Sequence, residues 1–334
     1  MPNIEVRPLP PEIWNRPAVA YSGYRAGQNP SSDSHPSREE ILEDLRLMRD
    51  EGFGLIRLFS AGVQGRRVLE LIAEHNLDLK VQLGAYVRGS DADNHAYNQR
   101  ELDKVIGLAT QHANTVVGVS IGNEILVSWS FVAVPPEDAI RYIRYARSQI
   151  PQPVTVNDNW EPYAVAPDQP KAAVWAEIDY ACIHTYAYWD AAWNTWDSRQ
   201  EGVEESARAG AIMDAALVYA KQNFAAARRA LDDGGRAIPI VIGETGWQTK
   251  PTAHQENAPA PDFAERLAGH ENQARYYRDM VEWTYGPGRT KRGDGFERPA
   301  GLFYFSAFDE PWKQADDNWG LWDADRNRKP VLDA

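Results

Sequence analysis

The sequence predicts a single α/β domain over residues 1–334, folded as a (β/α)8 TIM barrel. Short runs of apolar and β-branched residues alternate with amphipathic helical segments along the whole chain, and there are eight such runs. A doubly wound open sheet is the alternative arrangement of such a pattern. No Gly-x-Gly-x-x-Gly motif follows the first run, and this absence favours the barrel.

Each expected strand is a short apolar run of the kind that is buried on both faces in a parallel sheet. Several of the runs end in polar residues, where the chain should leave the sheet. The strands are expected at Ala20–Tyr24, Leu55–Phe59, Lys80–Tyr86, Val116–Gly122, Pro153–Asn157, Asp179–His184, Ile238–Gly243 and Gly301–Phe305.

The clearest helix lies in SREEILEDLRLMRDEG. Ser37 and Glu40 have the spacing of a capping box, Gly52 can end the helix, and Ile41 and Leu45 lie on one face. The other helices are expected at about Gly65–His75, Gln99–His112, Glu137–Gln149, Glu204–Leu231 and Glu271–Thr284.

Two longer irregular segments, Gln248–His270 and Gly286–Pro299, flank the last of these helices. They are either loops that shape the rim of a cleft or variable surface insertions. No internal repeat or linker divides the chain.

The composition excludes several classes of function. Hydrophobic residues make up 43%, enough for a full-sized core, and no apolar run approaches the ~20 residues that a membrane span needs. The formal net charge of −13 argues against nucleic acid and anionic membranes as partners. The opening MPNIEVRPLPPEIW lacks the features of a secretory signal. We therefore expect a cytoplasmic monomer, or a periplasmic or secreted protein if a signal has been removed.

Metal and redox chemistry are not expected. The single cysteine, Cys182, rules out internal disulfides and thiolate metal cages, and its apolar surroundings suggest a buried, inert thiol. The seven histidines show no His-x-His or His-Glu-x-x-His spacing. We expect no cofactor and no metal site, and a metal- or nicotinamide-dependent barrel enzyme is disfavoured.

Two strand ends carry matching carboxylic acids. An apolar run, a glycine and then a glutamate occur at SIGNE, ending in Glu124, and at VIGE, ending in Glu244. The C-terminal ends of barrel strands form the functional face, and a buried carboxylate costs several kcal/mol unless it is paired or protonated. A buried ion pair with Arg57 or Arg25 is one explanation. Two such residues on one face favour the other explanation, a carboxylate pair that cleaves glycosidic bonds.

Five ordered stretches carry a family resemblance. AYSGYRAGQNPSS, IRLFSA, VVGVSIGNEIL, PIVIGETGW, and FSAFDEPWK followed by NWGLWDADRNRKP resemble motifs of glycoside hydrolase family 17, the β-1,3-glucanase and β-1,3-glucanosyltransferase family, in its bacterial form. The resemblance runs nearly from end to end. It implies a retaining mechanism in which Glu124 is the general acid/base and Glu244 the nucleophile.

The resemblance also implies a set of substrate-binding residues. Asn123 is expected to bind the sugar 2-hydroxyl, and Tyr186, or else Tyr188, to donate a hydrogen bond to Glu244. Glu310 and Lys313 are expected as a charge pair beside the cleft. The remaining expected members, three of them stacking platforms or else core tryptophans, are Trp247, Trp312, Trp160, Arg57 and Tyr24.

The expected substrate is a β-1,3-glucan oligosaccharide or polysaccharide, which is hydrolysed or transferred. Another β-glucan is an alternative, because loops set that choice. A catalytically inactive carbohydrate-binding barrel is a further alternative, although such a protein usually lacks one of the carboxylates and this chain has both. Trp189, Trp193 and Trp196 in YWDAAWNTW are either acceptor-side platforms or helix core.

Overall fold

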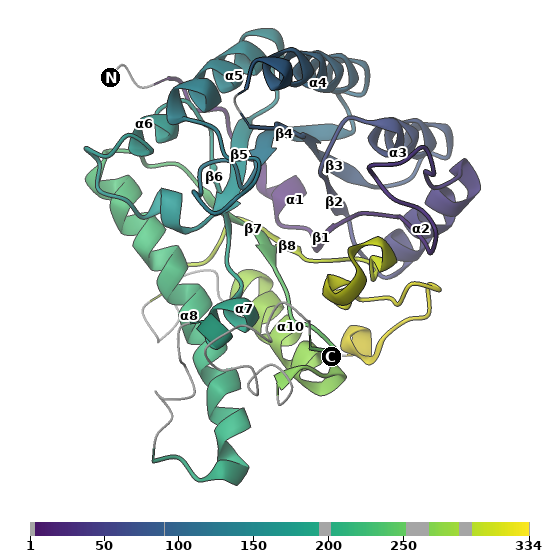
Figure 1. Ribbon diagram of the computed structural model, residues 1–334, viewed down its shortest axis with the longest axis vertical. Coiled ribbons are helices and arrows are strands. Elements are labelled where there is room, and N and C mark those ends of the chain that lie inside the picture. Colours follow the sequence, from purple (N-terminus) through teal and green to yellow (C-terminus); the bar gives the residue numbers. More distant parts are fainter. Residues whose placement is uncertain (1–3, 90, 194–201, 252–266, 287–295, 334) are drawn as a thin grey trace.

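The computed structural model describes residues 4–89, 91–193, 202–251, 267–286 and 296–333. The predicted barrel is confirmed. Eight parallel strands pair in chain order, and β1 closes the ring against β8. Helices surround the strands, and the long α8 projects well beyond the barrel (Figure 1).

Every predicted strand is present, with ends that shift by up to four residues. The strands are β1 (Ala18–Ala20), β2 (Leu55–Leu58), β3 (Lys80–Ala85), β4 (Val116–Asn123), β5 (Val154–Asn159), β6 (Ala181–His184), β7 (Ile240–Thr245) and β8 (Leu302–Tyr304). The α-helices are α1 (Pro11–Trp14), α2 (Arg38–Asp50), α3 (Val63–Glu74), α4 (Ala92–Gln111), α5 (Pro136–Gln149), α6 (Ala172–Trp175), α7 (Ala187–Trp193), α8 (Glu205–Asp233) and α10 (His270–Tyr285). Short 3₁₀ helices lie at η1 (Glu161–Tyr163), η4 (Pro311–Asp316) and η5 (Pro330–Asp333).

The capping box of α2 is confirmed. The Glu40 backbone N–H donates to Ser37 Oγ at 3.1 Å, and the Ser37 N–H donates to Glu40 Oε2 at 2.7 Å. Gly52 follows the helix with φ +96°, a conformation that glycine adopts without strain. By contrast, α4 begins seven residues before the predicted Gln99, because the Asp91 side chain accepts from the Asn94 N–H and caps an earlier turn.

The regular alternation of strands and helices breaks between β5 and β6. A full-length helix is replaced there by η1 and the four-residue α6. Trp175 of α6 is buried, and its Nε1 donates to the Pro162 carbonyl at 3.2 Å, so the two short helices pack together as one unit.

The N-terminal end of the barrel is closed by Trp14 of α1. Its ring packs edge-on against Tyr180 at a centroid distance of 5.1 Å and against Phe303 at 6.1 Å. Cys182 and Val241 complete this buried cluster inside the barrel. The open end therefore lies at the C-terminal ends of the strands. Within the part of the chain that is described, no helix combines the length and apolar character needed to cross a bilayer.

Candidate active site

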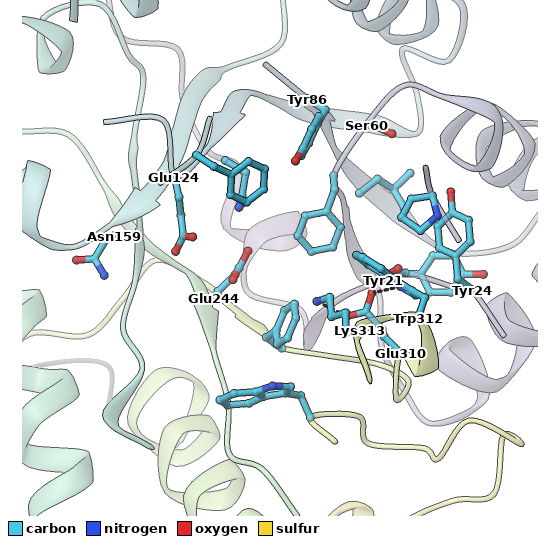
Figure 2. Close-up of a pocket in the computed structure, with 18 of the residues that line it drawn as sticks. Tyr21, Tyr24, Ser60, Tyr86, Glu124, Asn159, Glu244, Glu310, Trp312 and Lys313 are labelled. Atoms are coloured by element: carbon cyan, nitrogen blue, oxygen red, sulfur yellow. Dashed lines mark hydrogen bonds and ion pairs between the residues drawn. The ribbon is translucent and has the colours of Figure 1, made fainter. Parts of the chain in front are cut away.

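A cleft of about 1190 Å³ opens at the C-terminal ends of the strands. Glu124, directly after β4, and Glu244, within β7, both line it. Their carboxylate groups point toward each other across the cleft floor (Figure 2), and the nearest oxygens lie within 4.8 Å. The two glutamates that the sequence singled out are therefore brought together.

Glu244 is only 5% exposed, and both of its oxygens are bound. Arg57 Nη1 donates to Oε1 at 2.5 Å, and the Tyr186 hydroxyl donates to Oε2 at 2.6 Å. Burial alone would raise the pKa of Glu244. The charges of His184 and Arg57, together with these hydrogen bonds, outweigh it and lower the pKa to about 2. Glu244 is thus a fixed, ionised carboxylate.

Arg57 also orients the neighbouring amide. Arg57 is fully buried. Its Nη2 donates to Asn123 Oδ1, and its Nη1 also donates to the Gly243 carbonyl at 3.1 Å. Because the oxygen of Asn123 is engaged, its NH₂ group is the part left to donate to a ligand. The buried ion pair that the sequence raised as an alternative does exist for Glu244. It leaves that carboxylate charged, so it is compatible with a chemical role.

Glu124 is held by a different set of contacts. Its backbone has φ +53°, a left-handed conformation that is uncommon for a residue with a side chain and that turns the chain out of β4. The Glu124 N–H donates to the Asn157 carbonyl at 2.8 Å. Two residues on, the Leu126 N–H donates to Asp158 Oδ2 at 2.7 Å. Asp158 is completely buried; this burial, with the charge of Glu124, raises its pKa well above the usual range.

His184 connects the two glutamates. Its Nδ1 lies 3.1 Å from Glu124 Oε1, and its Nε2 lies 3.7 Å from Glu244 Oε1. The three side chains offer atoms close enough to share a metal ion. However, the guanidinium of Arg57 already supplies a fixed positive charge at Glu244 Oε1, so the arrangement is better suited to handling a proton than a second cation.

The two strand-end glycines make room for the side chains around the glutamates. A Cβ on Gly243 would lie 2.7 Å from Cys182 Sγ and 3.1 Å from His184 Cδ2. Gly122 has φ +88°, and a Cβ there would lie 2.7 Å from the Ile125 side chain. Both positions therefore need glycine, because a larger residue would displace these neighbouring side chains.

The wall of the cleft beside β1 and β8 carries the expected charge pair. Lys313 Nζ lies 2.6 Å from Glu310 Oε2 and 4.5 Å from the centre of the Phe305 ring. Trp312 Nε1 donates to Glu310 Oε1 at 3.3 Å. Tyr24 also lines this wall, and its burial, with the nearby charge of Glu310, raises its pKa to about 12. Figure 2 places these residues on one side of Glu244.

The opposite wall, after β5 and β6, is aromatic and polar. Trp160 and Trp189 are half-buried and line the cleft together with Asn159. The Trp189 ring stacks on Trp319 at 6.3 Å with an interplanar angle of 26°. Asn159 lies on the far side of Glu124 from the charge pair (Figure 2). The two glutamates thus separate two chemically different walls.

The BtgE/BtgC glycoside hydrolase domain model matches residues 18–321. This match covers most of the chain, including both glutamates. The chain belongs to the BtgE/BtgC glycoside hydrolase family. It is therefore a glycosidase, as the sequence motifs predicted.

Curated relatives of this glycosidase come from fungi. A "Glucan 1,3-beta-glucosidase" of Arthroderma benhamiae is 24% identical over 330 residues, which cover 93% of this chain and 90% of the relative. A "Probable glucan endo-1,3-beta-glucosidase btgC" of Aspergillus flavus is 24% identical over 319 residues. That alignment covers 89% of this chain but 40% of the relative, so the chain spans less than half the length of the second relative.

Solved structures share the fold of the glycosidase. An endo-laminarinase from Formosa Hel1_33_131 superposes with a TM-score of 0.81 at 22% identity, covering 97% of this chain and 88% of the other. A family 17 β-1,3-glucanosyltransferase from Rhizomucor miehei superposes with a TM-score of 0.63 at 19% identity, covering 95% and 96%. The resemblance to family 17 that the motifs suggested agrees with the names of these curated relatives and solved structures.

Three predicted substrate-binding residues of the glycosidase do not line its cleft: Arg57, Trp247 and Tyr188. Arg57 is buried and contacts Glu244 and Asn123 instead. Trp247 is completely buried, and its Nε1 donates to the Leu267 carbonyl at 2.7 Å. Tyr188 is also completely buried and packs edge-on against Trp247 at 5.1 Å. The prediction of Trp247 as a stacking platform is wrong, and Tyr186 rather than Tyr188 contacts Glu244. Both aromatic rings belong to the core that supports the site.

Of the three tryptophans in YWDAAWNTW, only the Trp189 side chain can be placed. Trp189 lies in the cleft wall, whereas the Trp193 side chain and Trp196 lie outside what the structure describes. Most of the two irregular segments, at 252–266 and 287–295, also lies outside it.

Several residues of the site were not predicted as part of it from the sequence. From the sequence, His184 can equally be a core histidine. Asp158 was not singled out, because its role depends on how two strand ends meet in space. Trp319 was noted only as part of the closing motif, and Phe305 only as part of that motif and as the end of the last predicted strand. Position at a strand end was the signal available for His184 and Asp158, since each ends or nearly ends its strand.

Proposed function

We propose that this glycosidase cleaves β-1,3-glucan with retention of configuration, with Glu244 as nucleophile and Glu124 as general acid/base. The observation that carries the proposal is the approach of the two carboxylates to within 4.8 Å. Retaining enzymes place their carboxyl groups about 5–5.5 Å apart, whereas inverting enzymes leave about 6.5–9.5 Å for a water molecule.

In the first step a Glu244 oxygen bonds to the anomeric carbon, and the bond from that carbon to the leaving oxygen breaks. Glu124 gives its proton to the leaving oxygen. Glu244 is suited to the attack because its pKa of about 2 keeps it ionised. The attack uses an oxygen that is already oriented by Arg57 or Tyr186, so little rearrangement is needed.

In the second step Glu124 takes a proton from water, and the water oxygen bonds to the anomeric carbon as the ester to Glu244 breaks. A sugar hydroxyl can replace water, and the product is then a longer chain. Trp160 and Trp189 line the wall on the Glu124 side, where the leaving group departs and an acceptor would enter. These aromatic faces favour glucanosyl transfer as a second activity of the same site.

The other residues hold these groups in place. Asn123 presents its NH₂ group to the 2-hydroxyl of the transferred sugar, a contact that strengthens in the transition state. His184 is a positioning residue, because it contacts both glutamates and is itself completely buried. Glu310, Lys313 and Tyr24 form the wall that binds the transferred part of the chain.

The substrate class rests on the relatives and on the size of the cleft. The curated relatives are named as a glucan 1,3-beta-glucosidase and a probable glucan endo-1,3-beta-glucosidase. The similar solved structures are named as an endo-laminarinase and a β-1,3-glucanosyltransferase. The cleft of about 1190 Å³ exceeds the usual range of about 300–1,000 Å³ for pockets that bury one small ligand, which suits several sugar units in a row.

Incubation with laminarioligosaccharides of defined length tests the proposal. Shorter products of the β-anomer, observed by NMR before mutarotation, support retaining hydrolysis, and products longer than the substrate support transfer. Glu244→Gln should remove turnover of every substrate, since no nucleophile remains. Release of the α-anomer, or turnover by Glu244→Gln at the wild-type rate, would contradict the assignment.

A further inference from the structure

Two large aromatic side chains stand exposed on the loop between β4 and α5. Trp129 is 61% exposed and Phe131 is 90% exposed. Among the described residues, the other exposed large hydrophobic side chains are Val63, Tyr145 and Val218, and none of these lines the cleft. Trp129 and Phe131 both line it. Because exposing such rings to water is unfavourable, their position at the cleft mouth requires an explanation.

The loop holds these rings out through a well-packed base. Val127, Val132 and Val134 are buried on either side of them. The Val134 N–H donates to the Ile125 carbonyl at 2.8 Å and closes the base of the loop. The Leu126 N–H is bound to the buried Asp158 carboxylate. The exposure of the rings is therefore a result of the loop's fixed path, not of a lack of packing around it.

The neighbouring loop after β3 adds polar groups to the same part of the cleft. Tyr86 and Arg88 of this loop line the cleft together with Tyr97 of α4, and the Arg88 guanidinium lies 3.9 Å from the centre of the Tyr97 ring. The two loops touch, since a Cβ on Gly89 would lie 3.6 Å from the Ala133 carbonyl. Aromatic faces with hydroxyl and guanidinium donors beside them match a pyranose, which offers C–H faces and hydroxyl edges.

We propose that Trp129 and Phe131 form a rim platform that binds glucosyl units away from the scissile bond and so favours long β-1,3-glucan chains over short ones. This inference rests on the proposed function. The catalytic pair lies at the cleft floor, where Glu244 is almost completely buried, whereas the platform lies at the exposed edge. A sugar on the platform is therefore not the sugar that reacts, and only a chain long enough to span both places uses it.

The first test compares kcat/KM on soluble laminarin with kcat/KM on laminaritriose. In Trp129→Ala/Phe131→Ala the ratio of the two should fall about tenfold, the effect expected when aromatic contact residues are truncated. Tyr145→Ala, which removes an exposed aromatic ring on α5, is the matched control and should leave the ratio unchanged. An unchanged ratio in the double variant would overturn the platform.

The second test does not need turnover. Glu244→Gln protein should be retained by insoluble linear β-1,3-glucan more than by cellulose, and adding Trp129→Ala/Phe131→Ala should abolish that difference. Equal retention of Glu244→Gln with and without the two ring substitutions overturns the platform. A dimer on size-exclusion chromatography that is lost in the double variant also overturns it, because the rings would then bind a second copy of the chain. If polymer binding depends on the two rings but the wild type cleaves no β-1,3-glucan, the proposed function fails and the platform stands.

Discussion

Replacing Glu244 should weaken the fold in a way that depends on pH. In the folded protein the pKa of Glu244 falls from its ordinary 4.5 to about 2. At 1.36 kcal/mol per pKa unit, this difference stabilises the folded state by about 3 kcal/mol at neutral pH. Glu244→Gln has nearly the shape of the protonated acid, so it should lose this contribution while keeping the packing.

The sign follows from the lowered pKa. The stabilisation is complete well above pH 4.5 and is lost as the pH falls toward 2. By pH 3 about 2 of the 3 kcal/mol should already be gone in the wild type. For 334 residues, at about 2.1 cal/mol/K each, Glu244→Gln should lower Tm by about 4 °C at pH 7 and by less than about 2 °C at pH 3.

Differential scanning calorimetry at pH 7, 5 and 3 measures this difference directly. Glu12→Gln, which neutralises an exposed carboxylate on α1, is the control and should shift Tm by less than a degree or so at each pH. A Tm difference for Glu244→Gln that is the same at pH 7 and pH 3 would refute the reasoning. It would mean that Arg57, His184 and Tyr186 do not hold this carboxylate ionised.

Three further predictions concern Tyr186, His184 and Cys182. Tyr186→Phe should lower kcat/KM at least about tenfold and move the acid limb of its pH profile upward, since a hydrogen bond that lowers the pKa of Glu244 is lost; an unmoved limb would count against it. His184→Asn should also move that limb upward, because the charge of His184 lowers the pKa of Glu244, whereas a merely structural role would reduce the rate at every pH alike. Burial raises the pKa of the Cys182 thiol to about 12, so iodoacetamide at pH 8 should label it only in denaturant, and rapid labelling of the native protein would contradict its burial.

The sequence was sufficient to predict the barrel and the position of the two glutamates at one end of it. Strand and helix patterns with different periods place the elements, and residues just after parallel strands must share one end of the barrel. The first strand shows where this reasoning loses precision. It was expected at Ala20–Tyr24 but ends at Ala20, so Tyr21 and Tyr24 line the cleft instead of the sheet.

The supporting residues were harder to predict, because their roles depend on the direction of each side chain. Trp247 and Tyr186 both lie near the end of a strand and both are aromatic. Trp247 turns outward into the core, and Tyr186 turns inward to Glu244. Apart from its place near a strand end, nothing in the sequence marked Asp158, since its partner Leu126 belongs to the loop after the neighbouring strand. Such a contact between one strand and the loop after its neighbour forms only when the two strands pair.

The hydrogen bond from the Val134 N–H to the Ile125 carbonyl joins the two ends of the loop between β4 and α5. Its tip can be lengthened, shortened or replaced while both of its ends stay where they are. The residues that carry out the reaction lie at the strand ends, whereas those that set the preference for chain length lie on this loop. Related enzymes could diverge in the polysaccharides they consume, and engineered ones could be redirected, by exchanging this one segment and leaving the strand ends untouched.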